Sequence, residues 1–374
     1  MRTVARNPRT NPTRNRRSPS LPVLITVLVM LAAACGSGDG TGTTAGEPSN
    51  ATSATAQPDD PGDEDLPTVV FQAFPADPAA IPLLVMQEQG LDREHGFIGE
   101  LLTVDPDAAM TTFLIGESDV ATEQDVVTTA IARQEGHETV AFYPVLNMAT
   151  GIVVPEDSPY QSPEDLVGEQ VGHFGVDSGT TTGIALMLNE LYGIDVYSDY
   201  QLSEVGPEAL PELLAGGEVE AIFNFQPLLV RATQITPGRY LFDSYTAWSE
   251  GPGDGWAPWL TNLTAKKEWI RDNPELALGV RDAWADAQQQ IVDSNYELMS
   301  EEPYASFLEL RNDEEVQGYI EYCQNIAPCF ASSWTEDDLA KAEDWVVRMQ
   351  AAGLLVEEVP EEPTAVILED FLDQ

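Results

Sequence analysis

Basic residues are scarce in this chain. It has 17 lysines and arginines against 63 aspartates and glutamates, which gives a formal net charge of −46 at pH 7. Six of the arginines lie in the first 17 residues, so residues 35–374 are near −52, from 11 basic and 63 acidic side chains. No basic stripe is left to neutralise phosphates, which excludes nucleic acid as a partner. Such self-repulsion needs salt to screen it, so we expect adaptation to high salt; a generally acidic secreted protein is the alternative.

Motifs for catalysis and metal binding are absent as well. The sequence has no Gly-x-Ser-x-Gly elbow, His-Glu-x-x-His pair, P-loop or glycine-rich dinucleotide fingerprint. Its three histidines, His95, His137 and His173, are scattered through the first half of the chain, far from the paired cysteines near the end. We therefore expect no metal site, no cofactor and no enzymatic activity.

What is present begins with a basic N-terminus followed by an apolar segment, residues 21–34. That segment is shorter than the roughly 20 apolar residues that span a bilayer, and it has the dimensions of a secretory signal. The ending Leu31-Ala-Ala-Ala-Cys35 resembles a bacterial lipoprotein signal, in which residues 1–34 are removed and Cys35 is lipidated. An ordinary signal peptide with an incidental cysteine is the alternative. Either predicts a protein outside the cytoplasm, and the first anchors it to the cell membrane.

Residues 35–67 are almost all Gly, Ser, Thr, Ala, Pro, Asp and Glu. This composition cannot bury enough apolar surface to order the chain, so we expect a flexible tether. The folded part begins near Thr68 and keeps about three hundred residues, enough for more than one lobe. Near its end, Cys323 and Cys329 flank a short segment with a proline, and outside the cytoplasm a disulfide between them is favoured over free thiols.

Strand-like and helix-like segments alternate through the folded part, which favours an α/β fold with parallel sheets. The expected strands are residues 69–73, 120–121, 139–145, 151–154, 170–174, 202–205, 221–225 and 240–243. Helices are expected between them and dominate after Ala265, including one that Thr335 and Asp338 cap ahead of Leu339. The same pattern occurs at Gly116 and at Gly217: an apolar helix ends, a turn with Gly and Glu follows, and a strand begins. This echo predicts two lobes built alike.

Five segments in this order resemble the solute-binding proteins of ABC importers, in the group that binds sulfonates, taurine, nitrate and thiamine-pyrimidine precursors. The resemblance covers residues 68–350 and rests on residues 81–96, 116–121, 162–172, 175–180 and 217–227. One departure is Gln226, which stands where many relatives have Glu. It puts in doubt any ligand that needs a carboxylate there.

The resemblance implies a two-lobed periplasmic-binding-protein fold, with two mixed sheets joined by two hinge strands near residues 147–153 and 243–248. Lobe 1 would then comprise residues 68–148 and 246–374, and lobe 2 residues 149–245. We accordingly expect a monomer that closes around a small molecule by hinge motion and delivers it to a membrane-spanning permease.

Ligands of open α/β sheets bind beyond the carboxyl ends of the strands, near helix N-termini. Four loops qualify on this ground, at residues 74–77, 122–125, 177–182 and 224–226. Separately, the tryptophans of a Gly/Pro-rich loop after the second crossing could line the cleft and stack on a ring or face a cationic ligand. The candidate ligand-binding residues are Phe74, Asp77, Gln124, Asp177, Ser178, Gly179, Thr180, Thr181, Asn224, Gln226, Trp248 and Trp256. A plain helix cap is the alternative role for Asp177 or Ser178, and loop packing is the alternative for the tryptophans, which include Trp259.

The ligand itself is open between two chemistries. Hydroxyls and backbone donors at residues 178–182 favour a sulfonate, a carboxylate or a similar anion, whereas the lack of basic residues in the four loops leaves a neutral heteroaromatic or a quaternary amine. A ligand-binding sensor or adaptor lipoprotein is the alternative function. An enzyme of pyrimidine-precursor synthesis on the same fold is less favoured, because the cysteine-rich segment of those enzymes has no counterpart here.

Overall fold

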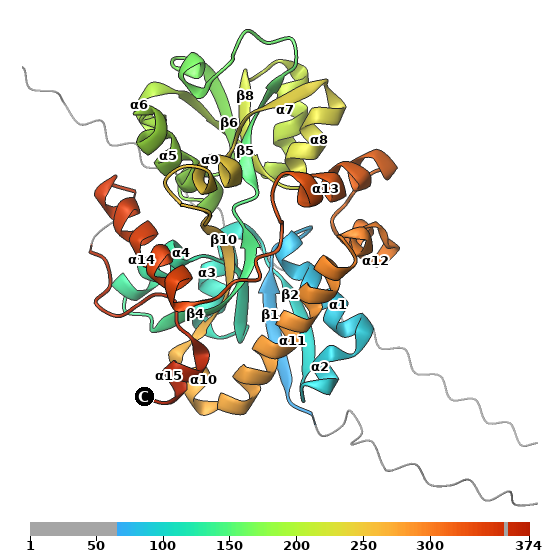
Figure 1. Ribbon diagram of the computed structural model, residues 1–374, viewed down its shortest axis with the longest axis vertical. Helices are drawn as coiled ribbons and strands as arrows, with labels where there is room; N and C mark the ends of the chain where they lie inside the picture. The colour runs from blue at the N-terminus through green and yellow to red at the C-terminus, as the bar shows by residue number, and fades with distance from the viewer. Residues whose placement is uncertain (1–65, 355–357) are drawn as a thin grey trace, which may run out of the picture. The chain divides into compact units, whose positions relative to one another are not determined.

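The computed structural model describes residues 66–354 and 358–374 (Figure 1). The predicted signal peptide, the lipidated Cys35 and the tether up to residue 65 lie outside these residues. Regular structure begins at Thr68, where the sequence predicted it. Within the described ranges, no helix is long and apolar enough to cross a membrane.

Sheet A has five strands in the order β2-β1-β3-β10-β4. Its strands are β1 (Thr68–Ala73), β2 (Ile98–Thr103), β3 (Val120–Gln124), β4 (Thr139–Asn147) and β10 (Trp259–Lys266). Strand β1 pairs in parallel with β2 and β3, whereas β10 runs antiparallel to β3 and β4. The helices between the first four strands are α1 (Ile81–Gln89), α2 (Leu91–Glu94), α3 (Pro106–Ile115) and α4 (Val126–Gln134).

Sheet B has the order β7-β6-β8-β5-β9 and is formed by the middle of the chain. Its strands are β5 (Thr150–Pro155), β6 (Gln170–His173), β7 (Gln201–Glu204), β8 (Ala221–Phe225) and β9 (Gly238–Asp243). Its helices are α5 (Gly179–Tyr192), α6 (Val196–Asp199), α7 (Leu210–Gly216) and α8 (Leu228–Ile235). Each sheet thus pairs parallel strands with one antiparallel strand between two neighbours, which confirms the predicted α/β class with mixed sheets.

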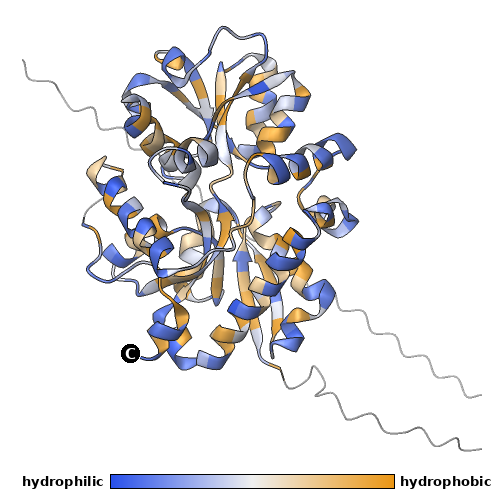
Figure 2. Cartoon of the chain, viewed as in Figure 1, coloured by the Kyte–Doolittle hydropathy of each residue, from blue (hydrophilic) through white to orange (hydrophobic). Residues whose placement is uncertain are grey.

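The C-terminal third is helical, as predicted. Its helices are α10 (Lys267–Asp272), α11 (Pro274–Asp293), α12 (Glu302–Phe307), α13 (Asp313–Asn325), α14 (Glu336–Ala351) and α15 (Leu368–Leu372). Helix α11 covers β1, where the Trp284 ring stacks on Phe71 with 5.5 Å between centroids. Helix α14 begins at the predicted capping box of Thr335 and Asp338. Hydrophobic residues concentrate on the strands and on the inner faces of the helices, and hydrophilic residues on the outer faces (Figure 2).

Two segments connect the sheets, and the second differs from the prediction. The first passes directly from β4 to β5 through Met148 and Ala149. The second was predicted as a strand near residues 243–248, but it forms the helix α9 (Ser244–Ser249), because the Asp243 carboxylate accepts a hydrogen bond from Thr246 N at 2.8 Å and caps it. Trp259, expected in a loop, is the first residue of β10. Strands β2 and β10 were not predicted.

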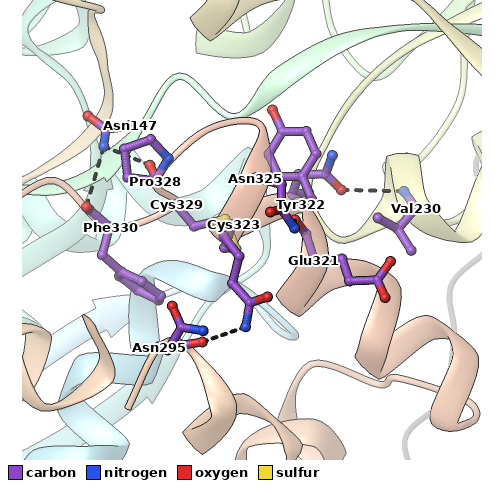
Figure 3. Close-up of a disulfide and its surroundings, with 12 residues drawn as sticks. Asn147, Val230, Asn295, Glu321, Tyr322, Cys323, Asn325, Pro328, Cys329 and Phe330 are labelled. Atoms are coloured by element: carbon purple, nitrogen blue, oxygen red, sulfur yellow. Dashed lines mark hydrogen bonds between the residues drawn. A yellow bond between two sulfur atoms is a disulfide. The ribbon is translucent and has the colours of Figure 1, made fainter. Parts of the chain in front are cut away.

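The structure joins Cys323 and Cys329 by a disulfide with 5.1 Å between their Cα atoms (Figure 3). Residues next to each cysteine form hydrogen bonds to the two segments that connect the sheets. Asn147, at the end of β4, donates its side-chain amide to Pro328 O at 2.7 Å. On the other side, the Tyr322 hydroxyl donates to Asp243 Oδ2 at 2.6 Å, just before α9. The disulfide therefore lies between the anchoring points of both connections.

Candidate functional site

Asp77 lies in the loop that follows β1, and it is buried. Its Oδ1 accepts a hydrogen bond from Ala79 N at 2.9 Å, so the carboxyl caps a short 3₁₀ turn. Burial raises the pKa of Asp77 to about 6, against the lowering effect of backbone hydrogen bonds from Ala79 and Phe74. Phe74 itself is half-buried. A buried carboxyl whose pKa is raised to about 6 therefore lies at the carboxyl end of β1.

A second carboxyl, Glu123, lies beside it near the end of β3. Its Oε1 accepts a hydrogen bond at 2.7 Å from the Gln72 side chain, which also donates to Ala109 O of α3. Burial is the largest cause that raises the pKa of Glu123 to about 7, and the charge of Asp77 adds to it. The sequence analysis had included Glu123 in the candidate loop but had not singled it out.

The register between β3 and β10 shifts at this edge of sheet A. Thr264 of β10 lies opposite Ala121 of β3, and Asn262 lies opposite Gln124. The same stretch therefore advances by two residues along β10 and by three along β3. An extra residue of this kind is a β-bulge, which re-aims a side chain. It places Gln124 directly across from Asn262, so both side chains leave the sheet on the same face. Gln124 Nε2 then reaches Met110 Sδ of α3 at 3.8 Å.

Polar atoms of this pair are buried and unpartnered. Gln124 is 3% exposed and Asn262 is fully buried, yet Gln124 Oε1 and both polar atoms of the Asn262 amide have no hydrogen-bond partner. Thr261 Oγ1, next along β10, is in the same state. Buried polar atoms are nearly always paired, so unpaired ones need a physical reason. Asn262 was missed by the sequence analysis, because β10 was not predicted as a strand.

At the start of α5 on sheet B, the candidate residues bond mainly to one another. Ser178 is the N-cap, and its hydroxyl accepts a hydrogen bond from Thr181 N at 3.2 Å. That hydroxyl also donates to Gly175 O at 3.0 Å and contacts the Thr181 hydroxyl at 2.9 Å. Thr180 is buried, whereas Asp177 is exposed and does not cap the helix. The capping alternative therefore holds for Ser178.

Asn224 and Gln226, at the end of β8, are also fully bonded. The Asn224 amide donates to Pro207 O at 2.9 Å, and its Oδ1 accepts from Phe225 N. The Gln226 amide donates to the Tyr240 hydroxyl at 2.7 Å, and its Oε1 accepts from Val230 N. Both side chains therefore brace sheet B from within.

The predicted loops of the two sheets face each other at Gly179. A Cβ atom at this position would lie 3.3 Å from Asp125 Oδ2, at the start of α4, and 3.9 Å from Leu260 of β10. Asp125 caps α4 by accepting from Thr128 N at 2.7 Å, and burial raises the pKa of its carboxyl. The structure therefore brings Gln124 and Asp125 of sheet A next to Ser178 and Gly179 of sheet B.

The two candidate tryptophans belong to a different environment. The Trp248 ring packs edge-on against Trp345 of α14, with 4.9 Å between centroids, and is 3% exposed. Trp256 packs against Trp259 at 5.9 Å. Both line a cavity of about 110 Å³ against α14, together with Lys341 and Arg348. Trp248 and Trp256 thus pack against other aromatic rings, as the alternative from the sequence proposed. Neither ring has a side-chain contact with Ser178 or Gln226 in the structure.

Comparison with known proteins identifies the family. Residues 73–299 match the model of the NMT1-like family. The chain belongs to this family. No curated protein sequence matches this NMT1-like chain significantly.

Among the described residues, no group of three or more His, Cys, Asp or Glu side chains is arranged to hold a metal ion.

Solved structures share the fold of this NMT1-like protein at low identity. The periplasmic aliphatic sulphonate binding protein SsuA from Escherichia coli has a TM-score of 0.62 and 16% identity, over 79% of this chain and 94% of that one. The alkanesulfonate-binding protein SsuA from Xanthomonas axonopodis pv. citri, bound to MOPS, has 0.62 and 15%, over 80% and 98%. The desulfurization enzyme DSZB has 0.56 and 17%, over 82% and 99%. These matches confirm the predicted two-lobed α/β fold.

Proposed function

We propose that this protein is a lipid-anchored solute-binding component of an ABC importer. It captures a small molecule between the edges of sheets A and B, closes about the two connecting segments, and delivers the ligand to a membrane permease. The observation that carries the proposal is the approach of Gly179, at the start of α5 beside sheet B, to Asp125, which follows β3 of sheet A. Polar loops that follow strands of the two sheets meet there. The carboxyl ends of such strands are where α/β folds bind ligands.

In this proposal the two lobes divide near residues 148 and 246. The lipid is attached to Cys35. Changing Cys35 to Ser should release the protein from the membrane fraction into the soluble extracytoplasmic fraction. A Ser37→Ala variant is the control, because it changes a residue close to Cys35 but keeps the thiol that would carry the lipid, so it should leave the protein on the membrane. Retention of the Cys35→Ser variant on membranes would contradict the anchor without affecting the binding function.

The test of binding is a thermal-shift screen of the full-length protein in high salt. The panel contains sulfonates, nitrate, carboxylates, pyrimidines, betaine and small amines. A ligand at 100 times its Kd should stabilise the protein by about 2.7 kcal/mol. Absence of any shift across the panel would contradict the proposal.

Gly179 offers a matched pair of variants for the closure step. A Gly179→Val side chain would be wedged against Asp125, so closure should be hindered and affinity for the ligand found in the screen should fall at least tenfold. Gly216→Val, in α7, is the control, because the nearest atoms to a Cβ there are 3.7 Å away on the Glu218 side chain. Equal affinities of the two variants would exclude closure at Gly179.

An enzyme is the other function that this fold supports, since DSZB shares it. The two are separated by recovering the bound compound. A solute-binding protein returns its ligand chemically unchanged after release, and it binds the permease more tightly when the ligand is present. Conversion of the ligand during incubation with the protein alone would favour the enzyme, and unchanged ligand without permease binding would favour a sensor.

A further inference from the structure

The cationic side chains of the described residues are all occupied away from the facing edges. Each lysine and arginine in residues 66–354 and 358–374 has an ion pair, a hydrogen bond or a ring contact with another group of the chain. None of these partners belongs to residues 74–77, 122–125, 175–182 or 224–226. Arg231, for example, pairs with Glu315 on α13, and Lys266 donates to Leu114 O. An anionic ligand would find no cation to pair with among these residues.

Carboxyl groups and amide oxygens, which accept hydrogen bonds, gather at the edge of sheet A. Asp77 is buried and Glu123 is half-buried, and their carboxyl groups are close enough for the charges to interact. The buried Asp125 follows two residues after Glu123. Gln124 Oε1 and Asn262 Oδ1 are buried acceptors without a donor. Carboxylates repel a sulfonate or nitrate and attract a cation. The unpaired amide oxygens add the hydrogen-bonding capacity that a ligand with N–H groups would fill.

We propose that Gln124 and Asn262 are the main hydrogen-bonding residues for the ligand, and that the ligand is a small cation with N–H donors, of the ammonium or guanidinium type. This inference rests on the proposed solute-binding function. The ligand donates to Gln124 Oε1 and Asn262 Oδ1, and its charge lies toward Asp77 and Glu123. Asn262 Nδ2 is left to donate to an oxygen that the ligand carries. The bulge in β3 is what aligns the two amides for this purpose.

The inference is tested with defined probes and the full-length protein in one high-salt buffer. The probes are methylguanidinium and ethanolamine as cations with N–H groups, tetramethylammonium as a cation without them, and methanesulfonate as an anion. Calorimetric titration should detect methylguanidinium or ethanolamine and give at least tenfold weaker binding of the other two. Stronger binding of methanesulfonate, or equal binding of tetramethylammonium, would overturn the inference.

Variants then locate the site. Asn262→Leu and Gln124→Met keep the side-chain volumes close to the originals and should weaken binding of the N–H cation at least tenfold. Their melting temperatures without ligand should not fall, because each loses a buried polar atom that had no partner. Thr139→Val is the matched control, because Thr139 is fully buried and its hydroxyl also has no partner. It lies at the start of β4 opposite Lys266, away from Asn262, which pairs with Pro144. This variant should change affinity less than twofold.

The outcomes separate this inference from the function on which it rests. If an anion or a neutral heterocycle is the ligand, or if Asn262→Leu binds the cation as the wild type does, the inference is wrong and the solute-binding function stands. If nothing in the wider panel binds, both are contradicted. Binding of the N–H cation that is lost in Asn262→Leu and kept in Thr139→Val supports both.

Discussion

The facing edges of the two sheets use their polar side chains differently. Throughout residues 150–243, which include all of sheet B, no buried side-chain nitrogen or oxygen lacks a partner. At the edge of sheet A, Gln124, Thr261 and Asn262 all have buried polar atoms without one. The comparison indicates a division of labour. The buried polar side chains of sheet B are satisfied within the protein, whereas the edge of sheet A carries unpartnered polar atoms that a ligand would satisfy under the proposed function.

The largest expected effect comes from breaking the support of sheet B. Arg231 of α8 and Glu315 of α13 form an ion pair in which both side chains are 3% exposed. Replacing Arg231 by Met leaves the Glu315 carboxylate buried and unpaired, which should cost about 3–5 kcal/mol in the free energy of unfolding. Urea denaturation measures it. The double variant Arg231→Met, Glu315→Leu should recover most of the loss, and a double variant as unstable as the single one would count against the pair.

The next effect concerns pH at sheet A. Burial raises the pKa of Asp77 to about 6 and that of Glu123 to about 7. The folded state therefore keeps these protons to higher pH than the unfolded chain, so its free energy of unfolding should fall as pH rises from about 4 to about 7. Each carboxyl contributes about 1.4 kcal/mol to this fall for every tenfold weakening of its acidity by burial. Asp77→Asn should flatten the fall in high salt, where general repulsion is screened. The same slope in wild type and variant would exclude Asp77 as its source.

A smaller loss of stability is expected from the disulfide, which ties α13 to the segment that holds Asn147. Changing Cys323 and Cys329 together to Ser should lower the free energy of unfolding by roughly 2 kcal/mol, as for a short closed loop. Chemical reduction of the wild type should reproduce the variant's melting temperature. A reduced wild type that melts like the oxidised one would show that the bond does not stabilise the fold.

Much of the fold could be predicted from the sequence, because helix caps and alternating apolar segments are local signals. The Thr335 capping box and the strand at residues 221–225 are examples. Strand β10 could not, since it follows a Gly/Pro-rich segment and its polar Thr261, Asn262 and Thr264 interrupt the apolar pattern. Its polar side chains are buried only because the chain returns from sheet B to insert β10 between β3 and β4.

The same topology limits what the sequence shows of the site. Gln124 and Asp77 were predicted because they follow strands, and that rule needs only local order. Asn262 lies near the beginning of an antiparallel strand, which reaches the carboxyl ends of its neighbours from the opposite direction. Trp248 was proposed from composition, and only the structure shows its contact with Trp345, nearly a hundred residues later.

The most direct test of the difference between the sheets compares two glutamines. Gln124 and Gln226 are each 3% exposed, but only Gln226 has partners for both amide atoms. Without ligand, Gln226→Met should lower the free energy of unfolding by about 1–3 kcal/mol, whereas Gln124→Met should lower it by less than about 0.5 kcal/mol. Equal losses, or a larger loss for Gln124→Met, would contradict the account that sheet A keeps its unpaired polar atoms for the ligand.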